Sequence, residues 1–299
     1  MNNLKIFQFI KCPDCGNRDF IESSSNLTIS CVKCSWSRSF SKDRRVLDLL
    51  PTKPKNVDEL VKNTSISEFY YKQFQKDLSV QDSEYVGWSI ASINSNNRQI
   101  FFLKKLKNIV TKAINLSACN ELLIDFSAGS GDYTFENSKK FDMVLHCDIN
   151  GDGLIGAKNR AEQLGIYNVI FIRCDYLQLP FVDECCDVAI MIDSLEYYGY
   201  SSDKSTVNNI YSILKANGIA ILDFHRKRLL KGNNVLYEYN KKDINLACKS
   251  NSCVVSSLGD WVIGRISSIS FSGRIIYSFL NWMFFLPAVR SIRAMRKVR

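Results

Sequence analysis

The stretch Glu121-Leu122-Leu123-Ile124-Asp125, followed after Phe126 by Ser127-Ala128-Gly129-Ser130-Gly131, decides the fold of this chain. Its first five residues form a short apolar run that ends in a carboxylate, which is typical of a buried strand. The small residues then predict a tight turn, and a helix is expected from Asp132. A strand, a small-residue turn and a helix N-terminus let backbone N–H groups approach a ligand closely. This turn is therefore the first candidate binding site.

Further strands are predicted downstream, and most of them end in polar groups. Residues 144–148 form an apolar run that ends at Asp148, seventeen residues after Gly131, and an acid at this place can accept hydrogen bonds from ribose hydroxyls. Asp175 follows a third predicted strand and Asp193 a fourth. One such acid could be a mere helix cap, but acids at successive strand ends favour a shared ligand site.

Helical patterns separate these strands. An apolar stripe at helical spacing covers residues 98–115, Asn150 can cap a helix that Gly165 terminates, and another helix is expected over residues 207–215 before a fifth strand at 219–224. This alternation predicts an α/β fold with a doubly wound, mostly parallel sheet. Ligands on such sheets bind beyond the carboxyl ends of the strands.

Two C-x-x-C pairs near the N-terminus predict a metal site. Cys12 and Cys15 are separated by fifteen residues from Cys31 and Cys34, a spacing that suits four thiolates around tetrahedral zinc. Such a site has no open position for water, so its expected role is structural. Disulfides are the alternative, but Met1 is followed by no signal-like segment, and a reducing compartment is expected despite eleven cysteines.

The net charge of +9 is concentrated at the two ends. Residues 1–55 contain ten basic and five acidic side chains, and residues 290–299 contain five basic and no acidic ones. The stretch between them contains 24 basic and 25 acidic side chains, so any electrostatic partner should contact the ends.

In their order, these motifs resemble those of class I S-adenosylmethionine-dependent methyltransferases, in particular the broad small-molecule or type 11 branch, over residues 85–260. Residues 122–131 look like the first motif and residues 147–150 like the ribose-binding second. Residues 168–181 are similar to the third, and residues 187–197 to the fourth. The resemblance implies a seven-stranded Rossmann-like sheet and S-adenosyl-L-methionine as cofactor. A zinc-ribbon segment often precedes such domains.

The resemblance also implies site residues. Gly129 and Gly131 should admit the methionine portion of the cofactor, Asp148 should hold its ribose, and Asp175 should meet the adenine amino group. The full expected cofactor set is Asp125, Ser127, Ala128, Gly129, Ser130, Gly131, Asp148, Ile149, Cys174, Asp175, Tyr176, Asp193 and Ser194.

Some positions depart from the family pattern or bear on catalysis. Ser127 stands where the family usually has its first glycine, and Tyr197 replaces a common histidine. If the acceptor must lose a proton, His225 at the end of the fifth strand is the best-placed base, with Tyr197 as a second candidate catalytic residue. His146 is expected to pack beside the adenosine if it has any role.

Three segments are expected: a zinc ribbon and linker at residues 1–55, a methyltransferase domain at 56–270, and a C-terminal helical tail at 271–299. The tail is apolar over residues 275–289 and then basic. It is too short to span a membrane, which leaves an interfacial anchor or a helix packed on the sheet. The expected location is cytoplasmic, or peripheral at the inner membrane surface.

The acceptor is not named by the sequence. One hypothesis is a methyltransferase for a small molecule, glycan or lipid intermediate. An alternative is a ribosomal RNA base methyltransferase that uses the basic zinc ribbon to bind RNA. A third is a non-catalytic scaffold that binds the cofactor. The oligomeric state is left open.

Overall fold

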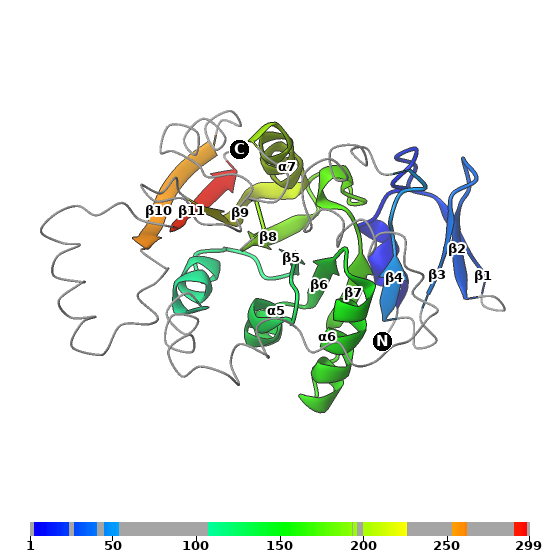
Figure 1. Cartoon of the computed structure of the whole chain (residues 1–299), viewed down its shortest axis with the longest axis horizontal. Coiled ribbons are helices and arrows are strands. Elements are labelled where there is room, and N and C mark those ends of the chain that lie inside the picture. The colour runs from blue at the N-terminus through cyan, green and yellow to red at the C-terminus, as the bar shows by residue number, and fades with distance from the viewer. Residues whose placement is uncertain are drawn as a thin grey trace, which may run out of the picture.

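The computed structural model describes residues 3–23, 27–40, 45–53, 107–192, 194–195, 200–225, 253–261 and 290–297. Two sheets form in this part of the chain, a small one of three strands and a large one of eight. Figure 1 shows the small sheet beyond one edge of the large one.

The centre of the large sheet is parallel, as the sequence predicted. It contains β5 (Leu122–Phe126), β6 (Met143–Asp148), β7 (Val169–Arg173), β8 (Cys186–Met191) and β9 (Leu214–His225). Their spatial order is β7-β6-β5-β8-β9, with parallel pairing throughout. This is the 3-2-1-4-5 order of doubly wound sheets, in which strand order reverses beside the first strand. The expected crevice therefore opens beyond the carboxyl ends of β5 and β8.

Helices cover both faces of this sheet. Residues 107–114 are helical, followed by α5 (Asp132–Asn137), η2 (Ser138–Lys140) and α6 (Gly151–Gln163), and later by η3 (Tyr176–Gln178) and α7 (Tyr200–Ile213). Figure 1 shows α5 and α6 on one side of the sheet and α7 on the other. Alternate residues of each strand consequently join different cores: Leu123 packs with Leu154 of α6, whereas Leu122 and Ile124 pack with Val207 of α7.

The ends of α6 confirm their predicted signals. The Asn150 side chain accepts a hydrogen bond from the Gly153 N–H at 3.2 Å, which caps the first turn. At the other end Gly165 has φ +67°, and the N–H groups of Gly165 and Ile166 donate to the carbonyls of Glu162 and Ala161. This paired arrangement terminates a helix through a left-handed residue.

The N-terminal module, residues 3–53, is packed against the large sheet. It contains η1 (Asn3–Gln8), the hairpin of β1 (Phe20–Ser23) and β2 (Thr28–Cys31), β3 (Ser37–Ser39) and β4 (Val46–Asp48). Buried Phe9, Ile10 and Trp36 belong to the same apolar cluster as β5 and β6 side chains. The module and the large sheet therefore share one core.

The large sheet contains the expected seven strands and one more. β4, from the predicted zinc-ribbon segment, pairs in parallel with β7 and becomes an eighth strand at that edge. β11 (Arg290–Lys297) lies between β9 and β10 (Cys253–Trp261) and pairs antiparallel with both.

The predicted C-terminal helix is wrong for residues 290–297, which form β11. Pairing on two sides satisfies the backbone of this segment and overrides the helical preference of its Arg, Ala and Met residues. Some basic side chains of this strand are also packed against the protein. Arg293 is buried, and Lys297 donates to the Leu214 carbonyl and pairs with Glu184 at 3.0 Å. Residues 271–289 lie outside the described part of the chain.

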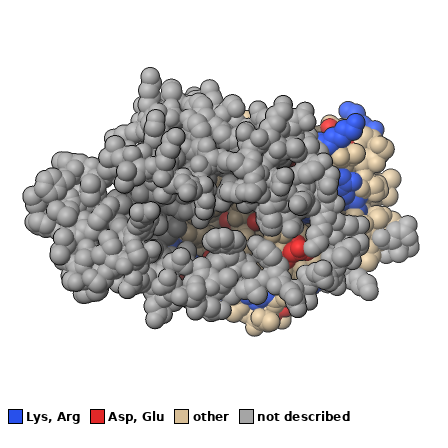
Figure 2. Space-filling view, in the orientation of Figure 1, with Lys and Arg blue, Asp and Glu red and all other residues tan. Residues whose placement is uncertain are grey.

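No helix within the described ranges has the length and apolar character needed to cross a membrane. On the face drawn in Figure 2, Lys and Arg atoms gather at the end of the molecule that the N-terminal strands form, and acidic atoms lie in a hollow nearer the middle. The basic end predicted for residues 1–55 is therefore visible at the surface.

Candidate functional site

The turn after β5, residues 127–131, is called the glycine turn below, and three of its residues have left-handed backbone conformations. Ser127, Gly129 and Gly131 have φ values of +51°, +52° and +81°. A glycine enters this region without steric cost, whereas serine does so with strain. Ser127, which replaces the usual first glycine, therefore still adopts the positive φ that a glycine adopts easily. The Ala128 N–H donates to the carbonyl of Cys147 at 3.0 Å, which ties the turn to β6.

Asp148, at the end of β6, reaches this turn. Its carboxylate accepts hydrogen bonds from the N–H of Gly129 at 3.0 Å and from the N–H of Asn150 at 2.9 Å. Burial raises the pKa of Asp148, and these backbone N–H groups oppose the rise because they favour the ionised form. The acid and the glycine turn are thus joined directly.

A small cavity that opens to solvent lies beyond the ends of β5, β6 and β7. Its lining residues come from three strand ends and the turns that follow them: Phe126, Ser127, Cys147, Asp148, Ile149, Cys174, Asp175 and Tyr176. Six of these belong to the set expected from the sequence. Phe126 and Cys147 were missed, although strand alternation places each on the side of its strand opposite a buried polar neighbour.

Asp175 and Tyr176 form one wall of the cavity. The Asp175 carboxylate accepts from the Leu177 N–H at 2.9 Å and caps η3, and burial raises the pKa of Asp175 to about 6. The Tyr176 hydroxyl donates to the carbonyl of Ser194 at 3.4 Å. Ser194 itself turns its hydroxyl toward the Ile192 carbonyl and does not line the cavity.

Other expected residues lie beside the cavity or cannot be placed. Ala128, Gly129, Ser130 and Gly131 form the adjoining turn without lining the cavity. Asp193 and Tyr197 lie outside the described residues, and of His225 only the backbone is described, at the end of β9. The roles expected of these residues stay predictions.

Asp125 and His146 form a buried polar network behind the glycine turn. They are register partners on β5 and β6, and both are fully buried. The Thr134 hydroxyl of α5 donates to the Asp125 carboxylate at 2.7 Å and lies 2.9 Å from His146 Nδ1. His146 Nε2 lies 3.2 Å from the Gly129 carbonyl oxygen. The chain of contacts therefore ends on the glycine turn itself.

The ring of His146 lies between Phe135 and Phe171 on the α5 side of the sheet, and His146 does not line the cavity. Burial lowers the pKa of His146 to about 3. Burial also raises the pKa of Asp125 to about 7, and the Thr134 hydrogen bonds oppose this rise. Both groups are therefore neutral at mildly acidic pH.

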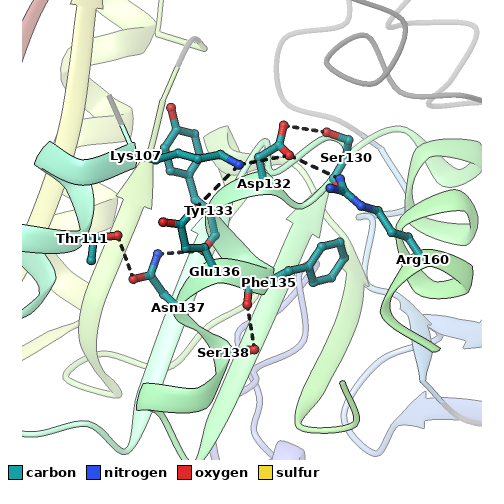
Figure 3. Close-up of polar contacts among 10 residues, drawn as sticks. All are labelled: Lys107, Thr111, Ser130, Asp132, Tyr133, Phe135, Glu136, Asn137, Ser138 and Arg160. Atoms are coloured by element: carbon teal, nitrogen blue, oxygen red, sulfur yellow. Dashed lines mark hydrogen bonds and ion pairs between the residues drawn. The ribbon is translucent and has the colours of Figure 1, made fainter. Parts of the chain in front are cut away.

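A second polar cluster holds the glycine turn from its outer side (Figure 3). Asp132, the first residue of α5, accepts from the Ser130 hydroxyl at 3.2 Å and pairs with Arg160 of α6 at 3.3 Å. Arg160 also donates to the Ser130 carbonyl at 2.9 Å, and Lys107 approaches Asp132 to 3.5 Å. Lys107 and Arg160 were not among the predicted site residues, because their contacts depend on how two distant helices pack.

The four predicted metal ligands are brought together. The Sγ atoms of Cys12, Cys15, Cys31 and Cys34 all lie within 4.8 Å of one another. Cys12 and Cys34 are 3.6 Å apart, and Cys15 and Cys31 are 3.5 Å apart. Zinc–sulfur bonds of about 2.3 Å in a tetrahedron place sulfurs about 3.8 Å apart, so the cluster is compatible with a zinc ribbon.

Local backbone geometry aims these sulfurs. Gly16 has φ +75°, and its N–H donates to the Cys12 carbonyl at 2.8 Å, which closes the first tight turn. In the second turn, the Lys33 N–H points at the Cys31 sulfur at 3.4 Å. An N–H group directed at sulfur stabilises a thiolate ligand.

Comparison with known proteins adds two findings. A family model described as a methyltransferase domain matches residues 123–218, the range that contains the glycine turn, Asp148 and Asp175. No curated protein matches this chain significantly.

Solved structures share the fold. The YcgJ protein of Bacillus subtilis is similar with a TM-score of 0.51 at 15% identity, over 64% of this chain and 99% of that one. Magnesium protoporphyrin IX methyltransferase (ChlM) of Synechocystis PCC 6803 is similar with bound SAM, at a TM-score of 0.50 and 17% identity. With bound SAH its TM-score is 0.52 at 16% identity, and both comparisons cover 82% of this chain and all of ChlM.

Proposed function

We propose that this class I, S-adenosylmethionine-dependent methyltransferase methylates a small-molecule, glycan or lipid-intermediate acceptor. The observation that supports its cofactor site best is the joining of Asp148 to the Gly129 N–H beside the cavity. An acid and a backbone turn are thereby held together beyond the carboxyl ends of parallel strands, where doubly wound sheets bind their ligands.

In the proposed binding mode, each strand end contacts a different part of the cofactor. Gly129 and Gly131 leave room for its methionine portion, and the carboxylate of Asp148 accepts hydrogen bonds from the ribose hydroxyls. Asp175 accepts from the adenine amino group, with Ile149, Cys174 and Tyr176 around the base. Their position in the cavity lining supports these roles for Asp148 and Asp175.

The cofactor supplies an electrophilic methyl group when bound, so the protein needs few reactive side chains of its own. Its task is to align the acceptor with that methyl group and to exclude water. We retain His225 as the proposed base for an acceptor that must lose a proton, since β9 ends at this residue, with Tyr197 as the second candidate.

We propose that the Cys12, Cys15, Cys31 and Cys34 cluster binds zinc. All four donors are thiols, the donor type that structural zinc sites use, and their spacing fits one ion. Four protein ligands leave no position for a substrate, so this ion would stabilise the fold of the module.

The packing of the N-terminal module favours the small acceptor over RNA. A separate RNA-binding domain keeps its own core, whereas Phe9, Ile10 and Trp36 of this module are buried in the core of the large sheet. RNA is nevertheless the second candidate, because Figure 2 shows exposed Lys and Arg atoms at the module end of the molecule.

Labelling with methyl-labelled cofactor tests both candidates. The chain is incubated with separated small-molecule, lipid, RNA and protein fractions of the source cell. Label in the small-molecule or lipid fraction is expected. Label in RNA that is lost at high salt would establish the alternative, and cofactor binding without label in any fraction would leave only a scaffold.

A cytoplasmic location with peripheral membrane contact is part of the proposal. Of the segment 275–299 expected to make this contact, residues 290–297 form β11, so the proposal keeps residues 275–289, which lie outside the described ranges. Co-sedimentation with anionic liposomes tests this contact. Replacing apolar side chains of residues 275–289 with polar ones should abolish sedimentation while the fold is retained, and this result would support the contact.

A further inference from the structure

We infer that the N-terminal module is a working part of the cofactor site, and that Gln178 and Arg173 are the positioning residues that join the two. On this view, metal binding to the four cysteines raises the affinity for the cofactor. The inference rests on the proposed function and deepens it, because it assigns a regulatory consequence to a site that otherwise only stabilises the module.

The first connection runs from the metal cluster to the Asp175 wall of the cavity. Gln178 Nε2 donates to the Pro13 carbonyl at 2.6 Å, and Pro13 lies between the ligands Cys12 and Cys15. Gln178 is the last residue of η3, and its own N–H donates to the Asp175 carbonyl at 3.0 Å. A shift of the first cysteine turn therefore acts directly on the turn that carries Asp175.

Backbone pairing makes this connection stiff. The Lys11 N–H donates to the Pro180 carbonyl at 2.9 Å, and the Val182 N–H donates to the Phe9 carbonyl at 3.0 Å. Ile10 and Phe181 form an antiparallel bridge between these bonds, and both are fully buried. The residues that lead into Cys12 are thus held as a strand against the segment that follows Gln178.

The second connection runs from β4 to the turn after Asp148. The buried guanidinium of Arg173 pairs with Asp48 of β4 at 3.4 Å, and its Nε donates to the Ile149 carbonyl at 3.1 Å. Ile149 lines the cavity and follows Asp148 directly. Because Arg173 is itself inaccessible to solvent, its orientation depends on these buried partners.

The segment after β4 is fastened to the metal cluster as well. The Thr52 N–H donates to the Asp14 carboxylate at 2.8 Å, and Asp14 lies within the first cysteine turn. The Trp36 indole N–H donates to the Leu50 carbonyl at 2.8 Å from just beyond the second pair. Both cysteine turns therefore hold the segment that follows β4, the strand whose Asp48 pairs with Arg173.

These two connections meet opposite parts of the proposed cofactor, the adenine wall and the ribose turn. If metal binding selects the arrangement in which both are formed, cofactor binding must raise metal affinity by the same factor. A module that merely packs beside the sheet would give no such coupling.

The test compares affinity for S-adenosylhomocysteine in zinc-loaded and chelated full-length protein by calorimetry. For the wild type we expect at least a tenfold tighter binding with zinc. Gln178→Leu removes the donor to Pro13 and should lower this ratio at least threefold, because only the connection through Arg173 and the backbone pairing remain, while zinc still binds in equal stoichiometry. Asn209→Ala is the matched control, since it removes a hydrogen bond of 3.2 Å from Asn209 of α7 to the Leu177 carbonyl of the same turn, a bond in which the module takes no part. It should keep the wild-type ratio.

A second measurement covers the case in which the chelated chain does not fold. Zinc affinity is determined by competition with a chromophoric chelator, with and without saturating S-adenosylhomocysteine. The wild type and Asn209→Ala should bind zinc more tightly with the nucleoside present, and Gln178→Leu should show a clearly smaller gain. Equal responses in the wild type and Gln178→Leu would overturn the inference. Failure of the zinc-loaded wild type to bind S-adenosylhomocysteine would instead overturn the proposed function, and with it the premise of this coupling.

Discussion

The hydroxyl of Thr134 lies 2.9 Å from Nδ1 of His146, in a part of the core where both side chains are fully buried. The same hydroxyl donates to an ionised Asp125. Because its single proton is used in this bond, the Thr134 hydroxyl can only accept a hydrogen bond from Nδ1–H of His146. Nε2 of the neutral imidazole then carries no proton and cannot donate to the Gly129 carbonyl. Protonation of Asp125 lets all these bonds run in the opposite direction, so that Nε2–H donates to the glycine turn.

This relationship predicts compensating pH effects on stability. Asp125 has its pKa raised from 3.8 to about 7, so alone it would lower the free energy of unfolding as pH rises from about 4 to 7. His146 has its pKa lowered from 6.5 to about 3, so alone it would lower that energy as pH falls from about 6.5 to 3. Between pH 4 and 6.5 folding therefore moves one proton from the histidine to the aspartate without net uptake.

Single substitutions should reveal how each group alone makes the free energy of unfolding depend on pH, compared with the wild type. In His146→Gln, stability should decrease from pH 4 to 7, and in Asp125→Asn it should decrease from pH 6.5 toward 3. Each decrease in the free energy of unfolding amounts to roughly 4–5 kcal/mol over its window at about 1.36 kcal/mol per pH unit. Urea unfolding across this pH range measures both. A double variant that keeps either slope would contradict the assignment.

Gly131→Ala should cost more stability than a change of conformation alone. A Cβ at Gly131 would lie 2.4 Å from the Phe135 ring, in addition to the strain of φ +81°. Gly165→Ala is the control, because φ is +67° there but nothing lies within 4 Å of the added Cβ. We expect about 1–2 kcal/mol for the control and clearly more for Gly131→Ala, with at least tenfold weaker S-adenosylhomocysteine binding. Equal losses in chemical unfolding would show that Phe135 moves away freely.

Asp148→Asn should weaken cofactor binding about 10- to 100-fold, which corresponds to one hydrogen bond to a charged group. The amide retains only one of the two oxygens that accept from Gly129 and Asn150. Asp142→Asn, an exposed acid just before the same strand, should bind normally. Calorimetric titration with S-adenosylhomocysteine distinguishes them, and an unaffected Asp148→Asn would remove this residue from the site.

The zinc-loaded chain should unfold in a single thermal transition. Module residues such as Trp36 and sheet residues such as Leu145 belong to one buried cluster, and separate domains would need separate cores. Chelation should lower the midpoint of the whole transition. Scanning calorimetry that resolves two transitions, of which only one responds to chelation, would contradict the shared core.

The sequence predicted what is local and missed what depends on packing. Asn150 and Gly165 act within their own helix, and the acids at strand ends follow from the parallel topology, so both could be anticipated. The partners of Arg173 could not, because Asp48 is 125 residues away and becomes a neighbour only when β4 pairs with β7. The side-chain partners of His146 depend on packing as well, since alternation along β6 turns it to the face opposite Cys147.

The position of β11 has a consequence for synthesis. β9 and β10 lie on either side of it and contact each other in the sheet only through it. While the ribosome has not yet released residues 290–297, β9 exposes an unpaired edge and β10 has no strand partner among the described strands. Such an edge is a template for pairing with another chain. The growing polypeptide thus carries an open sheet edge until residues 290–297 pair with β9 and β10.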